Sequence, residues 1–339
     1  MNFSNVKDWT IYEGSVIRVT DSLNRVIWEK PAPAQDTYFY VENPNDADLT
    51  MQFKRNHNYN DKTDTNPAHN PKFNVYKSTN LTTWNRITDN ISAAGNTFTV
   101  PANSRVYIKA VTEGYAGYDG DCQRDIWTVL NSVYSSSAPT TFNVGGNIMS
   151  LLFGDNFRTA TWYNNTNAFR DFFYQSRVVD ASNLYLADAN NSTCHGVFEK
   201  MFQYSRLVVP PQLPATSLGQ YSYKYMFQNC TALTTAPVLP ATTLSMDCYY
   251  YMFKNCTALT TAPVLPATVL EEECYEGMFY GCTALNSVTT YANTISVSRC
   301  LTDWLNGVAA TGDFYKLGSA NFPSGANGIP SGWTVHTTL

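Results

Sequence analysis

Residues 226–242 read Met-Phe-Gln-Asn-Cys-Thr-Ala-Leu-Thr-Thr-Ala-Pro-Val-Leu-Pro-Ala-Thr, and residues 252–268 repeat this sequence almost unchanged. A decayed copy follows at residues 278–285 and Met201-Phe202 precedes them, so the steps are 25, 26 and 26 residues (226 − 201, 252 − 226, 278 − 252). A fixed period of this length is typical of a solenoid, in which each unit, or rung, buries its apolar face against its neighbours. Because solenoids offer long binding surfaces, the repeat favours recognition over catalysis.

Within one rung, Cys248, Met252 and Cys256 are spaced i, i+4 and i+8, which places them on one helical face. We therefore expect a short helix through residues 249–253. Leu259, Ala262 and Val264 then give an apolar pattern typical of an extended leg with these side chains inward. Prolines in that leg cannot donate ladder hydrogen bonds, so we expect an imperfect strand.

Packed helices need about 8–10 Å each, whereas extended legs stack about 4.8 Å apart, so the array should curve with the extended legs inside. Repeated outward positions on that inner side form the candidate ligand surface, which consists of Thr235, Pro237, Thr261 and Pro263. A uniform, weakly charged surface suits a repetitive ligand such as a glycan, or a partner protein. The alternative is that nothing binds there.

The predicted repeat core contains the apolar residues that recur in phase, namely Cys230, Leu233, Cys248, Met252, Cys256, Leu259, Cys274, Met278, Cys282 and Cys300. Its cysteines could form a disulfide framework. We favour buried thiols, because cysteine behaves as a small apolar residue and a reducing compartment leaves it unpaired. A zinc site is disfavoured because the chain has no CxxC pair.

Four further segments surround the repeats at residues 195–310. Residues 1–34 combine a β-hairpin around residues 21–24 with a Pro-Ala linker, and Val16, Val19, Val26 and Trp28 are the predicted attachment residues of this anchor. Residues 35–112 predict a small β-sandwich with strands at 38–42, 49–54, 73–78, 84–88, 96–100 and 105–111. Residues 113–194 predict a transition and N-terminal cap, and residues 311–339 a C-terminal cap. The predicted fold class is thus α+β and multidomain, with a hairpin anchor, a sandwich and a curved solenoid.

Composition excludes several function classes. A net charge of −5 over 339 residues, without clustered Lys and Arg, argues against nucleic-acid binding. No apolar run approaches the roughly 20 residues that span a bilayer. The N-terminus lacks the basic start and apolar core of a secretory signal, so we expect folding in a cytoplasm.

No motif for catalysis, a cofactor or a metal stands out, and we predict none of the three. The loop at 57–69 holds His57, Asp61, Asp64 and His69, which are more typical of a solvated loop than of a metal site. Asp119, Asp121 and Asp125 resemble a calcium loop only in spacing, without its glycine and terminal glutamate in register. A carboxylate pair for glycoside cleavage has no positive support.

The rung also resembles a known family. Its pattern is Cys256-x-x-Leu259-x-x-Ala262-x-Val264-x-Pro266-x-x-Val269 followed by Cys274-x-x-x-Met278-Phe279-x-x-Cys282. This is similar to the BspA-like (Treponema-type) leucine-rich repeat, with Met in place of the family's Ala before Phe and Ala262 where Ile is usual. Such repeats occur in bacterial surface adhesins and in proteins of gut Bacteroidales and their phages.

Two other segments resemble phage proteins. Residues 8–29 look like the opening hairpin of phage appendage proteins, and residues 143–152 look like a segment that precedes these repeats in Bacteroides phage and prophage proteins. The resemblance implies a virion appendage protein without enzymatic activity, assembled in the host cytoplasm. Its partners would be other virion proteins through the N-terminus and a host surface glycan or protein through the repeats. By analogy it would form a homo-oligomer, a trimer. The alternatives are a bacterial surface adhesin and, less favoured, a glycan-cleaving enzyme.

Overall fold

Strands, not helices, dominate the chain. The computed structural model describes residues 6–12, 15–21, 26–29, 36–55, 72–88, 95–113, 128–133, 140–159, 168–186 and 195–338. Within these ranges, helix occurs only in α1 (Ser150–Phe153) and the 3-10 helix η1 (Gly154–Arg158), and residues 195–338 contain none. The predicted α+β fold with a curved leucine-rich-repeat solenoid is therefore wrong, because that repeat joins a strand to a helix or 3-10 turn in each unit. The argument for curvature, which needed helices on one side, fails with it.

The N-terminal strands form an antiparallel sheet. It has the order β1-β2-β3, from β1 (Val6–Tyr12), β2 (Ser15–Asp21) and β3 (Val26–Glu29). The last two strands correspond to the predicted hairpin, with Val19 opposite Trp28 in the register. The hairpin predicted around residues 21–24 did not include β1.

Two further sheets follow along the chain. The strands near the predicted positions are β4 (Tyr40–Asn43), β5 (Leu49–Arg55), β6 (Lys72–Ser78), β7 (Asn85–Thr88), β8 (Asn96–Val100) and β9 (Ser104–Glu113). They are joined by β10 (Thr128–Ser132), β11 (Phe142–Asn147) and β12 (Val178–Tyr185). The sheets have the orders β12-β11-β4-β9-β6-β7 and β10-β5-β8, and their buried side chains share one core. These sheets thus draw on strands well beyond residue 112.

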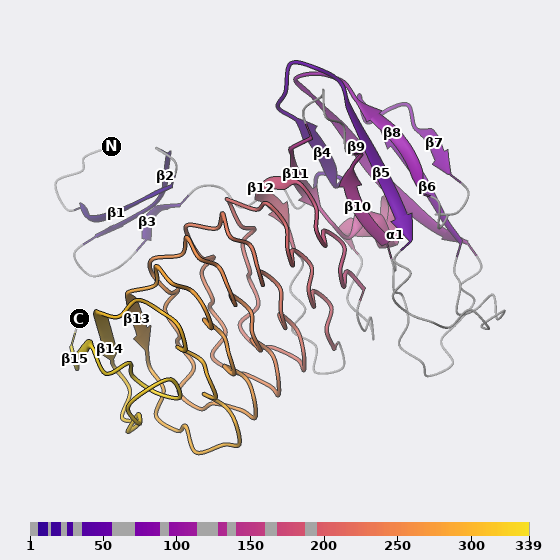
Figure 1. Ribbon diagram of the computed structural model, residues 1–339. Coiled ribbons are helices and arrows are strands. Elements are labelled where there is room, and N and C mark those ends of the chain that lie inside the picture. The colour runs from indigo at the N-terminus through magenta and orange to yellow at the C-terminus, as the bar shows by residue number, and fades with distance from the viewer. Residues whose placement is uncertain are drawn as a thin grey trace.

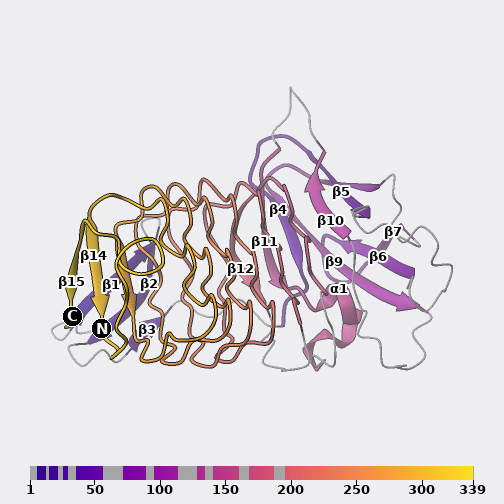
Figure 2. The ribbon, with the colours of Figure 1, turned by 60° about the horizontal axis from the view of Figure 1, so that its bottom comes forward.

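Strand β12 connects the larger sheet to the repeats. It pairs in parallel with β11 on one side, and Asp180 and Tyr185 form parallel bridges to Val209 and Gln212 on the other. From there the chain winds in successive rungs that lie side by side as far as the C-terminal strands (Figures 1 and 2). We call residues 168–186 and 195–338 the coil stack.

One side of each rung is a run of turns, which we call the turn edge. It comprises residues 168–177, 196–206, 221–230, 247–256, 273–282 and 299–307. Its amides alternate between two kinds of acceptor: Tyr225 donates to Tyr250 O in the next rung at 2.9 Å, whereas Met226 donates to Tyr223 O within its own rung at 3.1 Å. Each rung is thereby hydrogen-bonded both to itself and to its neighbour.

These turns replace the helix predicted at residues 249–253. The φ angle is positive at every fourth residue, at Asp247 (60°), Tyr251 (50°) and Asn255 (59°), each at the third position of a turn. The resulting period of four residues still buries Cys248 and Met252. Over eight residues this period is indistinguishable from the helical 3.6, which explains the wrong prediction.

Left-handed conformations at tyrosine and aspartate cost roughly 1–2 kcal/mol per residue. Successive rungs hold the same conformation at equivalent places, for example Tyr225 (57°) beside Tyr251 (50°). We attribute its persistence to the inter-rung hydrogen bonds and the buried core, which form together only in this geometry.

The opposite side of the rung, residues 233–244 and their equivalents, is the extended edge. Its side chains alternate, so that Pro237 and Leu239 are buried while Val238 is 69% exposed. In the next rung Val264, predicted to be inward, is 51% exposed, and Leu265 is buried instead. A proline can occupy the inner position because it has no amide hydrogen to leave unsatisfied.

Three parallel strands end the stack. They are β13 (Ser287–Thr290), β14 (Gly312–Lys316) and β15 (Trp333–His336), in that order. Phe322 stacks on the buried Trp304 ring at 5.9 Å between centroids, and Trp304 Nε1 donates to Gly328 O at 2.8 Å. The segment between β14 and β15 therefore covers the last aromatic ring of the core.

Candidate binding face

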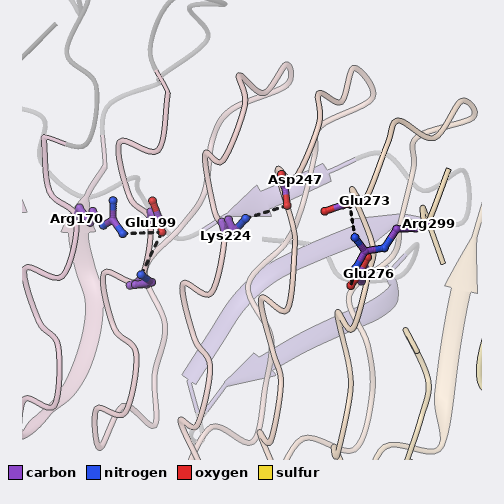
Figure 3. Close-up of polar contacts among 8 residues, drawn as sticks. Arg170, Glu199, Lys224, Asp247, Glu273, Glu276 and Arg299 are labelled. Atoms are coloured by element: carbon purple, nitrogen blue, oxygen red, sulfur yellow. Dashed lines mark hydrogen bonds and ion pairs between the residues drawn. The ribbon is translucent and has the colours of Figure 1, made fainter. Parts of the chain in front are cut away.

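Ion pairs run along the turn edge. Arg170 pairs with Glu199 at 3.2 Å and Lys224 with Asp247 at 2.9 Å, each across neighbouring rungs. Arg299 bridges two carboxylates of the preceding rung, Glu273 at 2.7 Å and Glu276 at 2.6 Å. Figure 3 shows these contacts in a row along the stack. Arg170 and Glu199 occupy equivalent positions of successive rungs, as do Glu273 and Arg299, whereas Lys224 pairs with a carboxylate three positions before its own equivalent, Tyr250.

Tyrosine rings surround the lysines of the same edge. Lys224 Nζ lies 4.2 Å from the ring centroid of Tyr250 and 5.0 Å from that of Tyr221. Tyr225 and Tyr251 stack at 5.9 Å, and Tyr250 meets Tyr251 edge to face at 4.6 Å. The rings thus contact each other and the ammonium groups.

Lys254 differs from the other lysines of the edge. Its Nζ lies 4.7 Å from the ring centroid of Tyr251 and 5.0 Å from that of Tyr280. Among the described residues no carboxylate lies within ion-pair distance of it. Its ammonium group therefore makes cation–π contacts with Tyr251 and Tyr280 in place of an ion pair with a described carboxylate.

Burial determines the protonation of the phenols. Desolvation raises the pKa of Tyr225, Tyr250 and Tyr251, and the nearby carboxylate of Glu276 raises the pKa of Tyr250 further. These hydroxyl groups therefore stay protonated across the physiological range and can both donate and accept hydrogen bonds.

Amides complete the polar face. Asn255 Nδ2 donates to Asn229 Oδ1 of the preceding rung at 2.9 Å, and Gln203 Nε2 donates to Gln228 Oε1 of the following rung. The edge offers phenols, amides and paired charges. Its chemistry is that of a hydrogen-bonding surface.

No protein-family model, curated protein or solved structure matches this chain. The binding face is therefore interpreted from its own residues.

The predicted ligand residues of the extended edge separate into two groups. Thr235 and Thr261 are exposed, whereas Pro237 and Pro263 are buried. Thr261 forms a parallel bridge with Ser287 of the next rung. The sequence reasoning missed the turn edge because it assigned the Tyr-rich segment at 249–251 to a helix. The sequence feature that could have revealed the turn edge is the set of polar residues beside Met-Phe in each copy of the repeat.

The residues assigned to the repeat core are all buried, and they include the free cysteines Cys230, Cys248, Cys256, Cys274, Cys282 and Cys300. Cys256 Sγ donates to Phe227 O of the preceding rung at 3.1 Å, and Cys282 Sγ to Phe253 O at 3.0 Å. Cys256 and Cys282 therefore join neighbouring rungs as thiols.

Several sites predicted from the sequence lie outside the described residues. For others the structure describes the backbone alone. The loops at 57–69 and 119–125, with their histidines and aspartates, lie outside. For Val16, Val19, Val26 and Trp28 only the strand pairing is described. Within the described ranges no cluster of His, Cys, Asp and Glu is arranged to hold a metal, and no helix is long and apolar enough to cross a bilayer.

A second, smaller candidate site lies on the sheet region. A hollow of about 550 Å³ is lined by Glu42, Thr79, Pro101, Asn103, Ser104, Arg105 and Tyr107. Arg105 Nε contacts Glu42 Oε1 at 2.7 Å, and its guanidinium lies 4.6 Å from the Tyr40 ring centroid. Because its charged groups already satisfy each other, this hollow supports no specific ligand.

Glu276 is expected to make the stability of the fold depend on pH. Its side chain is buried, and its Oε2 has no hydrogen-bond partner among the described residues. Desolvation raises its pKa above the usual 4.5 despite the opposing charge of Arg299. The ionised form therefore destabilises the fold above the folded-state pKa, and this cost disappears as the pH falls through that pKa.

Glu276→Gln should accordingly raise the free energy of unfolding near neutral pH, and its advantage should shrink towards about pH 4. Urea denaturation at both pH values measures this. The exposed neighbour Glu272 gives the control, since Glu272→Gln should change stability by less than about 0.5 kcal/mol. A Glu276→Gln protein that is less stable at neutral pH would show that the Arg299 pair outweighs desolvation.

Proposed function

We propose that the chain is a non-catalytic structural protein of a phage virion appendage that presents a binding face to the host surface. In this proposal residues 1–34 attach the chain to other virion proteins, and the coil stack displays the turn edge. The observation that carries it is the recurrence of hydrogen-bonding side chains at equivalent places in successive rungs, held by inter-rung contacts such as Lys224 with Asp247. Rigid, repeated presentation suits recognition of a surface.

The virion assignment is supported by the resemblance of residues 8–29 and 143–152 to phage appendage proteins. Attachment through the N-terminal segment agrees with its sheet, β1-β2-β3, which is built from residues 6–29 alone. A three-stranded sheet of this size gains stability when it packs against another surface. Docking on the particle would supply such a surface.

Mass spectrometry of purified virions tests the proposal. We expect peptides of the full chain in particles of the phage or prophage that encodes it, and their loss when residues 1–34 are deleted. Circular dichroism of the truncated chain should match the remaining fold. Absence of the full chain from virions would refute the proposal, and incorporation of the truncated chain would refute the role of residues 1–34.

A further inference from the structure

We propose that the turn edge binds a neutral polysaccharide laid along the stack, through hydrogen bonds rather than through charge or ring stacking. The inference rests on the proposed function and names the class of its ligand. Four properties of the turn edge carry it: its balanced charge, its covered aromatic faces, its hydrogen-bonding groups and its spacing.

The charges of the edge nearly cancel. The basic residues number seven and the acidic residues six, which leaves +1; they are Arg170, Arg177, Lys200, Arg206, Lys224, Lys254 and Arg299 against Asp171, Glu199, Asp247, Glu273, Glu276 and Asp303. Most of these groups are already paired across rungs, as described above. A polyanion would have to compete with these carboxylates for the cations, so an acidic polymer is disfavoured.

The aromatic faces of the central tyrosines, Tyr225 and Tyr251, are also occupied. The rings of Tyr225 and Tyr251 stack with their centroids 5.9 Å apart. Lys200 Nζ lies 5.7 Å from the Tyr225 centroid. Lys254 Nζ lies over the Tyr251 ring, whose centroid is 4.6 Å from that of Tyr250. A sugar ring or a flat base cannot replace these neighbours without breaking the edge, so stacking is a poor mode of binding here.

What remains for a ligand is the hydrogen-bonding capacity of partly exposed groups. Tyr204 is 47% exposed, and Tyr251, Lys254, Asn255 and Tyr280 are half-buried. Hydroxyl groups of a sugar can both donate to carboxylates and amides and accept from phenols and ammonium groups. A protein partner would need a cluster of apolar anchors to desolvate, and among the described residues of this edge only Tyr204 is a large exposed one.

The spacing of the rungs fits a chain of repeating units. Equivalent rings of the core, Phe173, Phe202, Phe227 and Phe253, follow one another at 5.0, 5.7 and 5.5 Å. A sugar unit in an extended polysaccharide advances by a similar length. Successive units would therefore meet equivalent positions of successive rungs, and weak hydrogen bonds would add up along the stack.

The test uses the full chain in affinity electrophoresis and calorimetry with dextran, yeast mannan, galactan and arabinoxylan as neutral probes. Polygalacturonate and chondroitin sulfate serve as acidic probes. We expect at least one neutral polysaccharide to bind, with a dissociation constant that is the same within about twofold at about 50 mM and about 500 mM NaCl. The double variant Tyr251→Phe/Tyr280→Phe keeps both rings and should bind about tenfold more weakly.

Thr261→Val is the matched control, because it removes a hydroxyl group from the extended edge of the same rung as Tyr251 and should leave binding unchanged. The inference is overturned if no neutral probe binds, if only acidic probes bind, if binding weakens strongly with salt, or if Thr261→Val and not the tyrosine variant impairs it. These failures leave the virion assignment intact, since that assignment depends on the presence of the chain in particles.

Discussion

Replacing Phe253 by alanine is expected to lower the free energy of unfolding by about 3–5 kcal/mol. Its fully buried ring stacks between Phe227 and Phe279, with centroids 5.5 Å away on both sides and interplanar angles of 14° and 1°. Removing it leaves a cavity that opens onto two neighbouring rungs. Because each rung is stabilised by its neighbours, the loss should affect the whole stack.

Urea denaturation followed by circular dichroism measures this loss. Val264 on the same rung provides the control, since its side chain is 51% exposed and Val264→Ala should cost less than about 0.5 kcal/mol. Equal effects of the two substitutions would contradict the packing described here.

The cysteines of the stack are expected to react with thiol reagents about a thousandfold more slowly in the folded protein than after unfolding. Burial raises the pKa of Cys230, Cys248 and Cys282 from the usual 9 to about 12, which depletes the reactive thiolate by a similar factor at mildly alkaline pH. Their fully buried sulfur atoms are also inaccessible to a reagent until the rungs open.

Timed labelling with iodoacetamide and intact-mass analysis test this expectation. Cys122 and Cys194 are replaced by serine beforehand, so that only the six thiols of the stack are counted. Six slow labels in the native protein and six fast labels in denaturant are the expected result. Rapid labelling of the native protein would contradict the burial, and a mass lower by pairs of hydrogens would reveal disulfides instead.

Periodicity allowed much of the local structure to be predicted from the sequence. The alternation of apolar residues located β5 and β8, and the phase of the repeat identified Cys230 and Met252 as buried residues. These features depend only on which residues are buried, and the spacing of apolar residues in the sequence indicates that directly.

The errors arose where two structures share one pattern. A spacing of four residues between Cys248, Met252 and Cys256 fits a helix and also fits the repeated turns with positive φ at every fourth residue. Likewise, both Val264 and Leu265 are apolar, and only the position of the buried Pro263 selects the second as inward. The role of β12 in both the sheet and the stack depends on parallel pairing between distant segments, which a single sequence does not reveal.

The candidate binding face was missed for the same reason. Tyr250 and Lys224 approach each other only because their rungs stack in register, although they are separated by a full repeat in the sequence. The residues were visible in the sequence, but their neighbours could not be inferred before the geometry of the turn edge was known.

Disulfide trapping between two rungs tests the register of the stack most directly. Val269 and Thr294 are exposed and form a parallel bridge. Because paired strands lie about 4.8 Å apart, the Cα atoms of Val269→Cys/Thr294→Cys fall within the roughly 4.4–6.8 Å that a disulfide requires. In the Cys122→Ser/Cys194→Ser background, this pair should oxidise rapidly and nearly completely in monomeric protein. Val264→Cys/Thr294→Cys should not, because five extended residues move the first thiol by about 16 Å. Failure of the first pair to close, or equal closure of both pairs, would contradict the stacked register on which the binding face depends.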